Sequence, residues 1–221
     1  MPVLLLIDTA IDQAQIGLSV DGRLLAEKKH LLRQDHATFL HPAIQQLLSD
    51  QHLSIRQLDG IAVSAGPGSY TGIRIGMATA SGLAYALRCP LMALSTLELI
   101  AREMIQTYPE ADFYAPLIDA RRMEVFTAVY DKQGHPQLSP QPHILTDESF
   151  APFLQKAVVV FGGNGAAKWR QRCSYSRAIW HNTISNLLTM NELALQHWKN
   201  QNFIQVHQAT PLYLKDFHPG R

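Results

Sequence analysis

The hydrophobic pattern predicts three strands in the N-terminal part of the chain. Apolar positions recur in three short runs, and the first of them ends at Asp8-Thr9. The dipeptide Asp21-Gly22, a strong hairpin signal, separates the second run from the third. The three strands are expected at residues 3–7, 16–20 and 23–29.

Helical periodicity follows these strands. A helix is expected to begin near Asp35, which would cap it. Pro42 lies within this stretch, so either the helix kinks there or its main part begins at Pro42. Five apolar residues share one face of this helix: Ala37, Leu40, Ile44, Leu47 and Leu48. A strand at 61–63 and a helix that continues to about residue 87 come next.

The remainder alternates between strand and helix patterns, which is typical of an α/β protein. Residues 131–155 are rich in proline and are expected to be irregular. Strands are expected at 91–94, 113–118, 125–130 and 157–161, and helices at 96–107 and 183–199. We expect two lobes: residues 1–107, completed by the helix near 183–200, and a smaller α/β lobe at residues 108–221.

The glycine-rich residues 65–76 lie between a strand and a helix, a geometry that suits anion binding. A Walker A loop would end in Gly-Lys-Ser/Thr, whereas here Gly72 is followed by Ile73-Arg74. The following helix carries four small residues spaced by four: Gly72, Gly76, Ala80 and Ala84. This small-residue ridge fits either an ordinary buried helix or a face on which a partner helix docks closely, and spacing alone does not separate the two.

Composition limits the function classes. The chain has 221 residues and a formal net charge of +1, so it lacks the strong positive charge of a nucleic-acid-binding domain. Its two cysteines are too few for a disulfide framework and favour a reduced cytoplasmic setting. The apolar run at residues 3–7 is too short to span a membrane and lacks the features of a signal peptide.

Five motifs occur in order along the chain: Asp8-Thr9, His36 with Pro42, residues 66–76, Asp119-Ala120-Arg121 with Glu124-Val125, and residues 211–215. Together they resemble the motifs of the TsaB (YeaZ) family. The glycine motif at residues 66–76 is the most specific of them, although Tyr70 and Ile73 depart from the usual Phe and Leu.

The resemblance implies a two-lobed sugar kinase/Hsp70/actin-like fold with mixed sheets flanked by helices. It implies a role in forming threonylcarbamoyladenosine at position 37 of ANN-decoding tRNAs. In that family the protein is a non-catalytic scaffold that dimerises with its catalytic paralogue TsaD, and the ATPase TsaE joins them. The chain would contact tRNA indirectly, through the complex. ATP or ADP would lie at the interface of the complex and would not bind tightly to this chain. In the absence of TsaD, the chain would form a homodimer. The older peptidase label of such proteins is not carried over.

On this interpretation the helix from Asp35 and the helix from Thr71 pack against the equivalent helices of TsaD. A large side chain at Gly76 or Ala80 is then expected to abolish TsaD binding while the subunit still folds. The expected interface residues are His36, Leu40, Ile44, Leu47, Gly72, Arg74, Gly76, Ala80 and Ala84.

The fold also suggests a vestigial nucleotide site. Asp8-Thr9 matches the first phosphate loop of actin-like proteins, and Gly162, Gly163 and Gly165 match the adenosine loop. The alternatives are that Asp8 only ends a strand and bonds its turn, and that the glycines only permit a tight turn. A phosphotransferase or ATPase, the alternative function, would need a second carboxylate, for which Asp119 is the best placed.

Metal and charge patterns favour no catalytic centre. His36 and His41 are five apart, so they do not share a helix face, and position 40, four residues on from His36, is a leucine. We therefore expect no metal. Asp119, Arg121, Arg122 and Glu124 are expected to form a hairpin corner whose opposite charges satisfy one another, with a partner-facing role for the arginines as the alternative.

Overall fold

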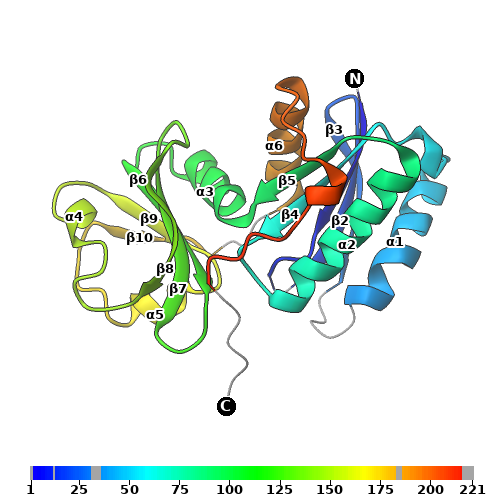
Figure 1. Ribbon diagram of the computed structural model, residues 1–221. Helices are drawn as coiled ribbons and strands as arrows, with labels where there is room; N and C mark the ends of the chain where they lie inside the picture. The colour runs from blue at the N-terminus through cyan, green and yellow to red at the C-terminus, as the bar shows by residue number, and fades with distance from the viewer. Residues whose placement is uncertain (1, 12, 31–35, 183–185, 216–221) are drawn as a thin grey trace, which may run out of the picture. The chain divides into compact units, whose positions relative to one another are not determined.

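The apolar runs form the strands of two five-stranded sheets, each in its own compact unit (Figure 1). The computed structural model describes residues 2–11, 13–30, 36–182 and 186–215. Unit 1 comprises Met1–Thr96 and Asn186–Leu212, and unit 2 comprises Leu97–Ser185 and Tyr213–Arg221.

The sheet of unit 1 has the strand order β3-β2-β1-β4-β5 and is mixed. Its central strand β1 pairs antiparallel with β2 and parallel with β4. Asp21 and Gly22, both at positive φ, turn β2 into β3 as expected. The strands are β1 (Val3–Asp8), β2 (Ala14–Val20), β3 (Arg23–His30), β4 (Gly60–Gly66) and β5 (Leu91–Ser95).

Helices cover both faces of this sheet, which explains why β1 is apolar along its whole length. Alternate residues of β1, such as Leu5 and Ile7, join the core formed with α1 and α2. The opposite face receives α6, where Leu187 lies against Gly17 of β2. The helices are α1 (His36–Asp50), α2 (Tyr70–Leu87) and α6 (Leu187–Lys199), with short 3-10 turns η1 (Ile55–Gln57) and η2 (Val206–Gln208).

The sheet of unit 2 has the order β10-β9-β6-β7-β8 and is also mixed. Strand β6 pairs antiparallel with β7 and parallel with β9. The elements are α3 (Thr96–Thr107), β6 (Phe113–Asp119), β7 (Glu124–Asp131), β8 (Pro136–Ile144), α4 (Ala151–Leu154), β9 (Val159–Gly162), α5 (Ala166–Arg170) and β10 (Ala178–Trp180).

An aromatic core fills one face of the second sheet. Trp169 lies with its ring centroid 4.6 Å from that of Phe161 and 5.1 Å from that of Phe150. On the other face α3 brings Met104 against Gly162, and Nε2 of His181 lies 3.6 Å from a carboxylate oxygen of Glu103. Because α3 makes these contacts, it belongs to unit 2, and the unit boundary falls at residue 96 rather than at the expected residue 107.

Two further expectations differ from the structure. Residues 131–155 contain the nine-residue strand β8, whose prolines are tolerated because β8 lies at the edge of its sheet. Helix α1 continues through Pro42, so this proline does not begin the helix, and the proposed cap Asp35 lies outside the described residues. None of the helices within the described ranges has the length and apolar character needed to cross a membrane.

Candidate functional site

Asp8, at the end of β1, is a buried carboxylate whose oxygens are engaged within unit 1. Its side chain is 3% exposed. Oδ1 accepts a hydrogen bond from the backbone N–H of Ala10 at 3.1 Å, and Oδ2 accepts one from Nε2 of Gln15 at 3.0 Å. Asp8 therefore closes the turn after β1 with both of its oxygens, which is the structural alternative that the sequence left open.

Thr9 ties this turn to helix α2. Its backbone N–H donates to Oγ of Ser64 at 3.3 Å, and its hydroxyl donates to the carbonyl oxygen of Gly72 at 2.8 Å. A Cβ built on Gly72 would lie 2.1 Å from the carbonyl oxygen of Thr9, and one built on Gly76 would lie 2.3 Å from Oγ1 of Thr9. These two glycines are therefore required because the end of β1 touches the backbone of α2.

The loop before α2 is packed in the same way. The N–H of Ser69 donates to the carbonyl oxygen of Ala10 at 2.6 Å, and a Cβ on Gly68 would lie 2.0 Å from that oxygen. Ser69 then caps α2, since its Oγ accepts a hydrogen bond from the N–H of Gly72 at 3.3 Å. The loop before α2 and the turn after β1 are therefore in direct backbone contact.

The small-residue ridge of α2 and the apolar stripe of α1 therefore form the core of unit 1, and the prediction that they dock a partner is wrong. Leu40 and Ala80 are each fully buried, and the other members are buried with them in the same core: Ile44, Leu47, Gly72, Gly76 and Ala84. The physical reason is that the ridge fits against β1 and β4, so no second helix reaches it. His36 begins α1, but its side chain lies outside what the structure describes.

The opposite face of α2 is the exposed one, and of its residues the sequence predicted only Arg74 as part of an interface. Arg74, Ala78 and Gly82 are exposed there, and Tyr85 retains 79% of its accessible surface. A Cβ built on Gly82 would meet no atom within 4 Å. Near the start of the helix, the guanidinium of Arg74 lies 3.9 Å from the ring centroid of Tyr70. The four-residue spacing of Ala78, Gly82 and Ala86 carried the signal, but it equals the spacing of the buried ridge.

The glycine loop of unit 2 packs against the end of β6. Gly163 has φ +96°, which favours glycine, and its Cβ would lie 2.5 Å from the carbonyl oxygen of Leu117. Cβ atoms on Gly162 and Gly165 would lie 2.7 Å from Sδ of Met104 and 3.0 Å from the N of Asp119. Close contacts with Leu117, Asp119 and Met104 thus account for all three glycines without a nucleotide.

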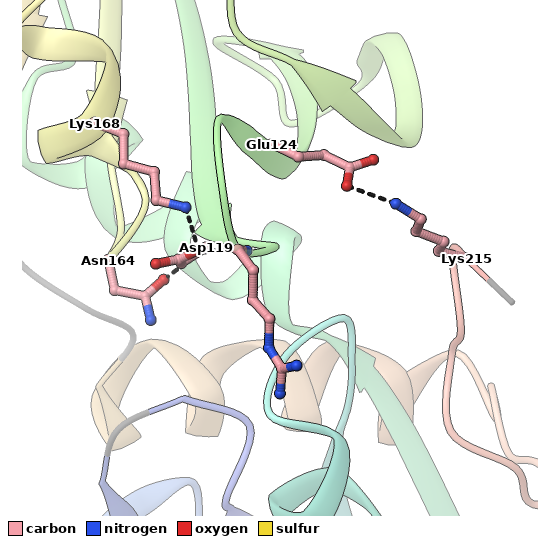
Figure 2. Close-up of polar contacts among 6 residues, drawn as sticks. Asp119, Glu124, Asn164, Lys168 and Lys215 are labelled. Atoms are coloured by element: carbon pink, nitrogen blue, oxygen red, sulfur yellow. Dashed lines mark hydrogen bonds and ion pairs between the residues drawn. The ribbon is translucent and has the colours of Figure 1, made fainter. Parts of the chain in front are cut away.

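Asp119 lies at the centre of the polar contacts in Figure 2, where Lys168 and Asn164 converge on it. Its carboxylate forms an ion pair with Lys168, and its N–H donates to Oδ1 of Asn164 at 2.9 Å. On the other arm of the hairpin, Nζ of Lys215 lies 2.6 Å from Oε2 of Glu124. Both acids are thus neutralised by lysines, and the expectation that Arg121 and Arg122 would neutralise them is wrong.

The described residues offer no metal-binding cluster and no activated thiol. Within them, no three His, Cys, Asp or Glu side chains are grouped so that they could hold an ion. Burial raises the pKa of the Cys89 thiol and that of the Cys173 thiol, which disfavours the reactive thiolate. Asp8 and Asp119, the two carboxylates that phosphotransfer would require, belong to different units.

Comparison with known proteins gives a consistent assignment. Residues 29–138 match the family model described as TsaD, tRNA N6-adenosine threonylcarbamoyltransferase. The Escherichia coli protein TsaB is 33% identical, over 96% of this chain and 94% of that protein, and the Haemophilus influenzae TsaB is 28% identical, over 96% and 93%. Both are tRNA threonylcarbamoyladenosine biosynthesis proteins.

The structure of YeaZ from Pseudomonas aeruginosa superposes with a TM-score of 0.80 at 29% identity and covers 97% of this chain and all of that one. Together with the two mixed sheets and their flanking helices, this match confirms the sugar kinase/Hsp70/actin-like fold that the motifs predict. The chain belongs to the TsaB (YeaZ) family of tRNA threonylcarbamoyladenosine biosynthesis proteins.

Proposed function

We propose that this chain is a cytoplasmic, non-catalytic scaffold for threonylcarbamoyladenosine formation at adenosine 37 of ANN-decoding tRNAs. It dimerises with TsaD and thereby allows TsaE to join the complex. The chain contacts tRNA indirectly, through this complex. The observation that carries the proposal is the combination of the full-length TsaB relatives with an α2 helix that has one face packed and one face exposed.

The polar groups at the end of β1 support a non-catalytic role. Phosphotransfer needs a carboxylate that is available to hold Mg²⁺ or to activate a nucleophile. Asp8 instead closes its own turn with both oxygens, and the hydroxyl of Thr9 is buried against Gly72. Asp119 is held by Lys168. A phosphotransferase or ATPase would first have to break these contacts.

The exposed face of α2 supports docking of a partner helix. Ala78 and Gly82 let a second backbone approach closely, because neither carries a side chain beyond Cβ. Tyr85 lies on the same face and offers a large, exposed aromatic surface, the residue type that is enriched at interface centres. Arg74 adds a cation at the other end of the same face. We assign TsaD as the partner that binds this face. When TsaD is absent, a second copy of the chain binds the same face.

Reconstitution tests the scaffold role directly. Purified TsaD, TsaE, a threonylcarbamoyl donor and an ANN-decoding tRNA are combined with and without this chain, and modified nucleoside is measured. We expect modification only when the chain is present. Full modification without the chain would contradict the proposal.

Nucleotide binding separates the scaffold from its rival. Since the loop before α2 packs directly against the turn after β1, we expect the isolated chain to show neither tight ATP binding nor turnover, and any ATP or ADP to be held at the interface of the complex. Calorimetry with ATP and Mg²⁺ on the isolated chain is the measurement. Tight one-to-one binding accompanied by hydrolysis would favour an independent ATPase.

A further inference from the structure

A second exposed feature lies in unit 2, at the turn between β6 and β7. Arg121 and Arg122 both have positive φ, at 70° and 47°. Backbone hydrogen bonds close the turn: the N–H of Glu124 donates to the carbonyl oxygen of Arg121, and the N–H of Ala120 donates to that of Glu124, each at 3.1 Å. The N–H of Arg121 also donates to Oδ1 of Asp119 at 2.6 Å. Three hydrogen bonds therefore stabilise this conformation of the turn.

Arginine is an unfavourable choice for such a turn. Tight hairpins that need positive φ at two adjacent positions normally use Asn-Gly or Asp-Gly, because a longer side chain is strained there. The chain uses Asp21-Gly22 in this way between β2 and β3. The two arginine side chains at residues 121 and 122 are thus not explained by the geometry of the backbone.

No acidic side chain of the described residues pairs with the guanidinium group of either arginine. Both side chains are exposed, and within the part of the chain that the structure describes neither guanidinium forms an ion pair. The two nearest acids in sequence are neutralised by other residues, since Asp119 pairs with Lys168 and Glu124 pairs with Lys215 (Figure 2). The turn therefore presents two positive charges at its surface.

Apolar side chains continue this surface. Met123 follows the two arginines and is 36% exposed, and Ile144 of β8 is 69% exposed. Met123 directly precedes β7, and Ile144 ends the neighbouring strand β8: Ile144 is opposite Glu124, and the N–H of Leu145 donates to the carbonyl oxygen of Met123 at 2.7 Å. We define the residues 121, 122, 123 and 144 as the arginine turn surface.

This mixture of charge and apolar area favours a protein over a nucleic acid. Nucleic-acid binding draws its strength from many phosphate contacts, whereas here two arginines stand beside two aliphatic side chains on a chain of net charge +1. Arginine and methionine are enriched in protein interfaces, and a guanidinium pairs with a carboxylate through two parallel hydrogen bonds. We propose that the arginine turn surface binds an acidic segment of a protein in the assembled complex, separately from the exposed face of α2.

The test compares charge reversal with a matched control. Arg121→Glu with Arg122→Glu removes the proposed contact, while Lys132→Glu with Arg170→Glu makes the same change in charge at two other exposed positions of unit 2. Calorimetry measures the affinity of each variant for purified TsaD and for TsaE added to the TsaD complex. We expect the arginine variant to lose about tenfold or more in one of these affinities, and the control to keep both.

A second variant separates binding from folding. Arg121→Asn with Arg122→Gly supplies the residues that the backbone prefers, so we expect its thermal unfolding midpoint to rise while the same affinity falls. Unchanged affinities in both arginine variants would overturn the inference. So would a loss confined to tRNA binding, because the surface would then contact nucleic acid.

The choice of TsaD and TsaE as binding partners rests on the proposed function. Binding of the wild-type chain to these two proteins tests that function independently of the arginine variants. If the wild type binds neither protein, both proposals fail. If it binds them normally and the arginine variants do so too, only the arginine turn surface is disproved.

Discussion

The two faces of α2 carry almost the same small-residue spacing and have different roles. Gly72, Gly76, Ala80 and Ala84 face the sheet, where any side chain beyond hydrogen at the two glycines would strike Thr9. Ala78 and Gly82 face outward, and a Cβ on Gly82 meets nothing. Small residues therefore mark close approach only where a neighbour is in place. On the outer face that neighbour is the partner we propose.

The largest expected effect on stability comes from making the same glycine-to-leucine substitution on each face of α2. Gly76→Leu forces a side chain into Thr9, and we expect it to cost at least about 3 kcal/mol and to unfold unit 1. Gly82→Leu on the outer face should gain up to about 1 kcal/mol, because leucine is the better helix former. Urea unfolding followed by circular dichroism measures both. Similar stabilities of the two variants would refute the assignment of the faces.

Leu40 tests whether the α1 stripe belongs to the core. It is fully buried, so Leu40→Ala should cost about 2–5 kcal/mol through lost contact and the cavity that remains. Leu188 on α6, 62% exposed, is the matched control, and its change to alanine should stay within about 0.5 kcal/mol. Equal, small effects in chemical unfolding would mean that the α1 stripe is a surface after all.

The smallest of these stability effects concerns the bond between β1 and α2. Thr9→Val removes the hydroxyl that donates to the carbonyl oxygen of Gly72, and we expect a loss of about 1 kcal/mol. Thr71, exposed near the start of α2, provides the comparison: Thr71→Val should change stability by less than about 0.5 kcal/mol. Thermal unfolding distinguishes them, and a larger effect at Thr71 would count against the contact.

Local patterns predicted most strands and helices, because alternation and helical stripes record which faces are buried. The face of α2 could not be predicted, since Gly and Ala provide little contrast in hydrophobicity and the deciding contact, from Thr9 to Gly72, spans 63 residues. Strand β8 was missed because its prolines are typical of loops as well as of sheet edges. The place of α3 in unit 2 depends on Met104 meeting Gly162, a contact that no local pattern records.

The roles of the candidate site residues also depend on contacts that local sequence patterns do not record. Asp8, Thr9 and the 162–165 loop were recognised by type, yet the sequence left open whether they bind a nucleotide or close turns. Hydrogen bonds from Gln15 and Ala10 to Asp8, and the approach of Gly163 to Leu117, account for them as turns. The lysines that pair with Asp119 and Glu124 come from distant segments, so the exposure of the two arginines became apparent only in the folded chain.

The affinity of a Gly82→Trp variant for TsaD tests the central claim most directly. The bulky side chain occupies open space on the outer face, so the subunit should keep its wild-type unfolding midpoint. Gln196→Trp, at an exposed position of α6, is the control. We predict that calorimetry shows a loss of about tenfold or more for Gly82→Trp and none for the control. Wild-type affinity in a folded Gly82→Trp variant would contradict the assignment of the outer face of α2 to the partner.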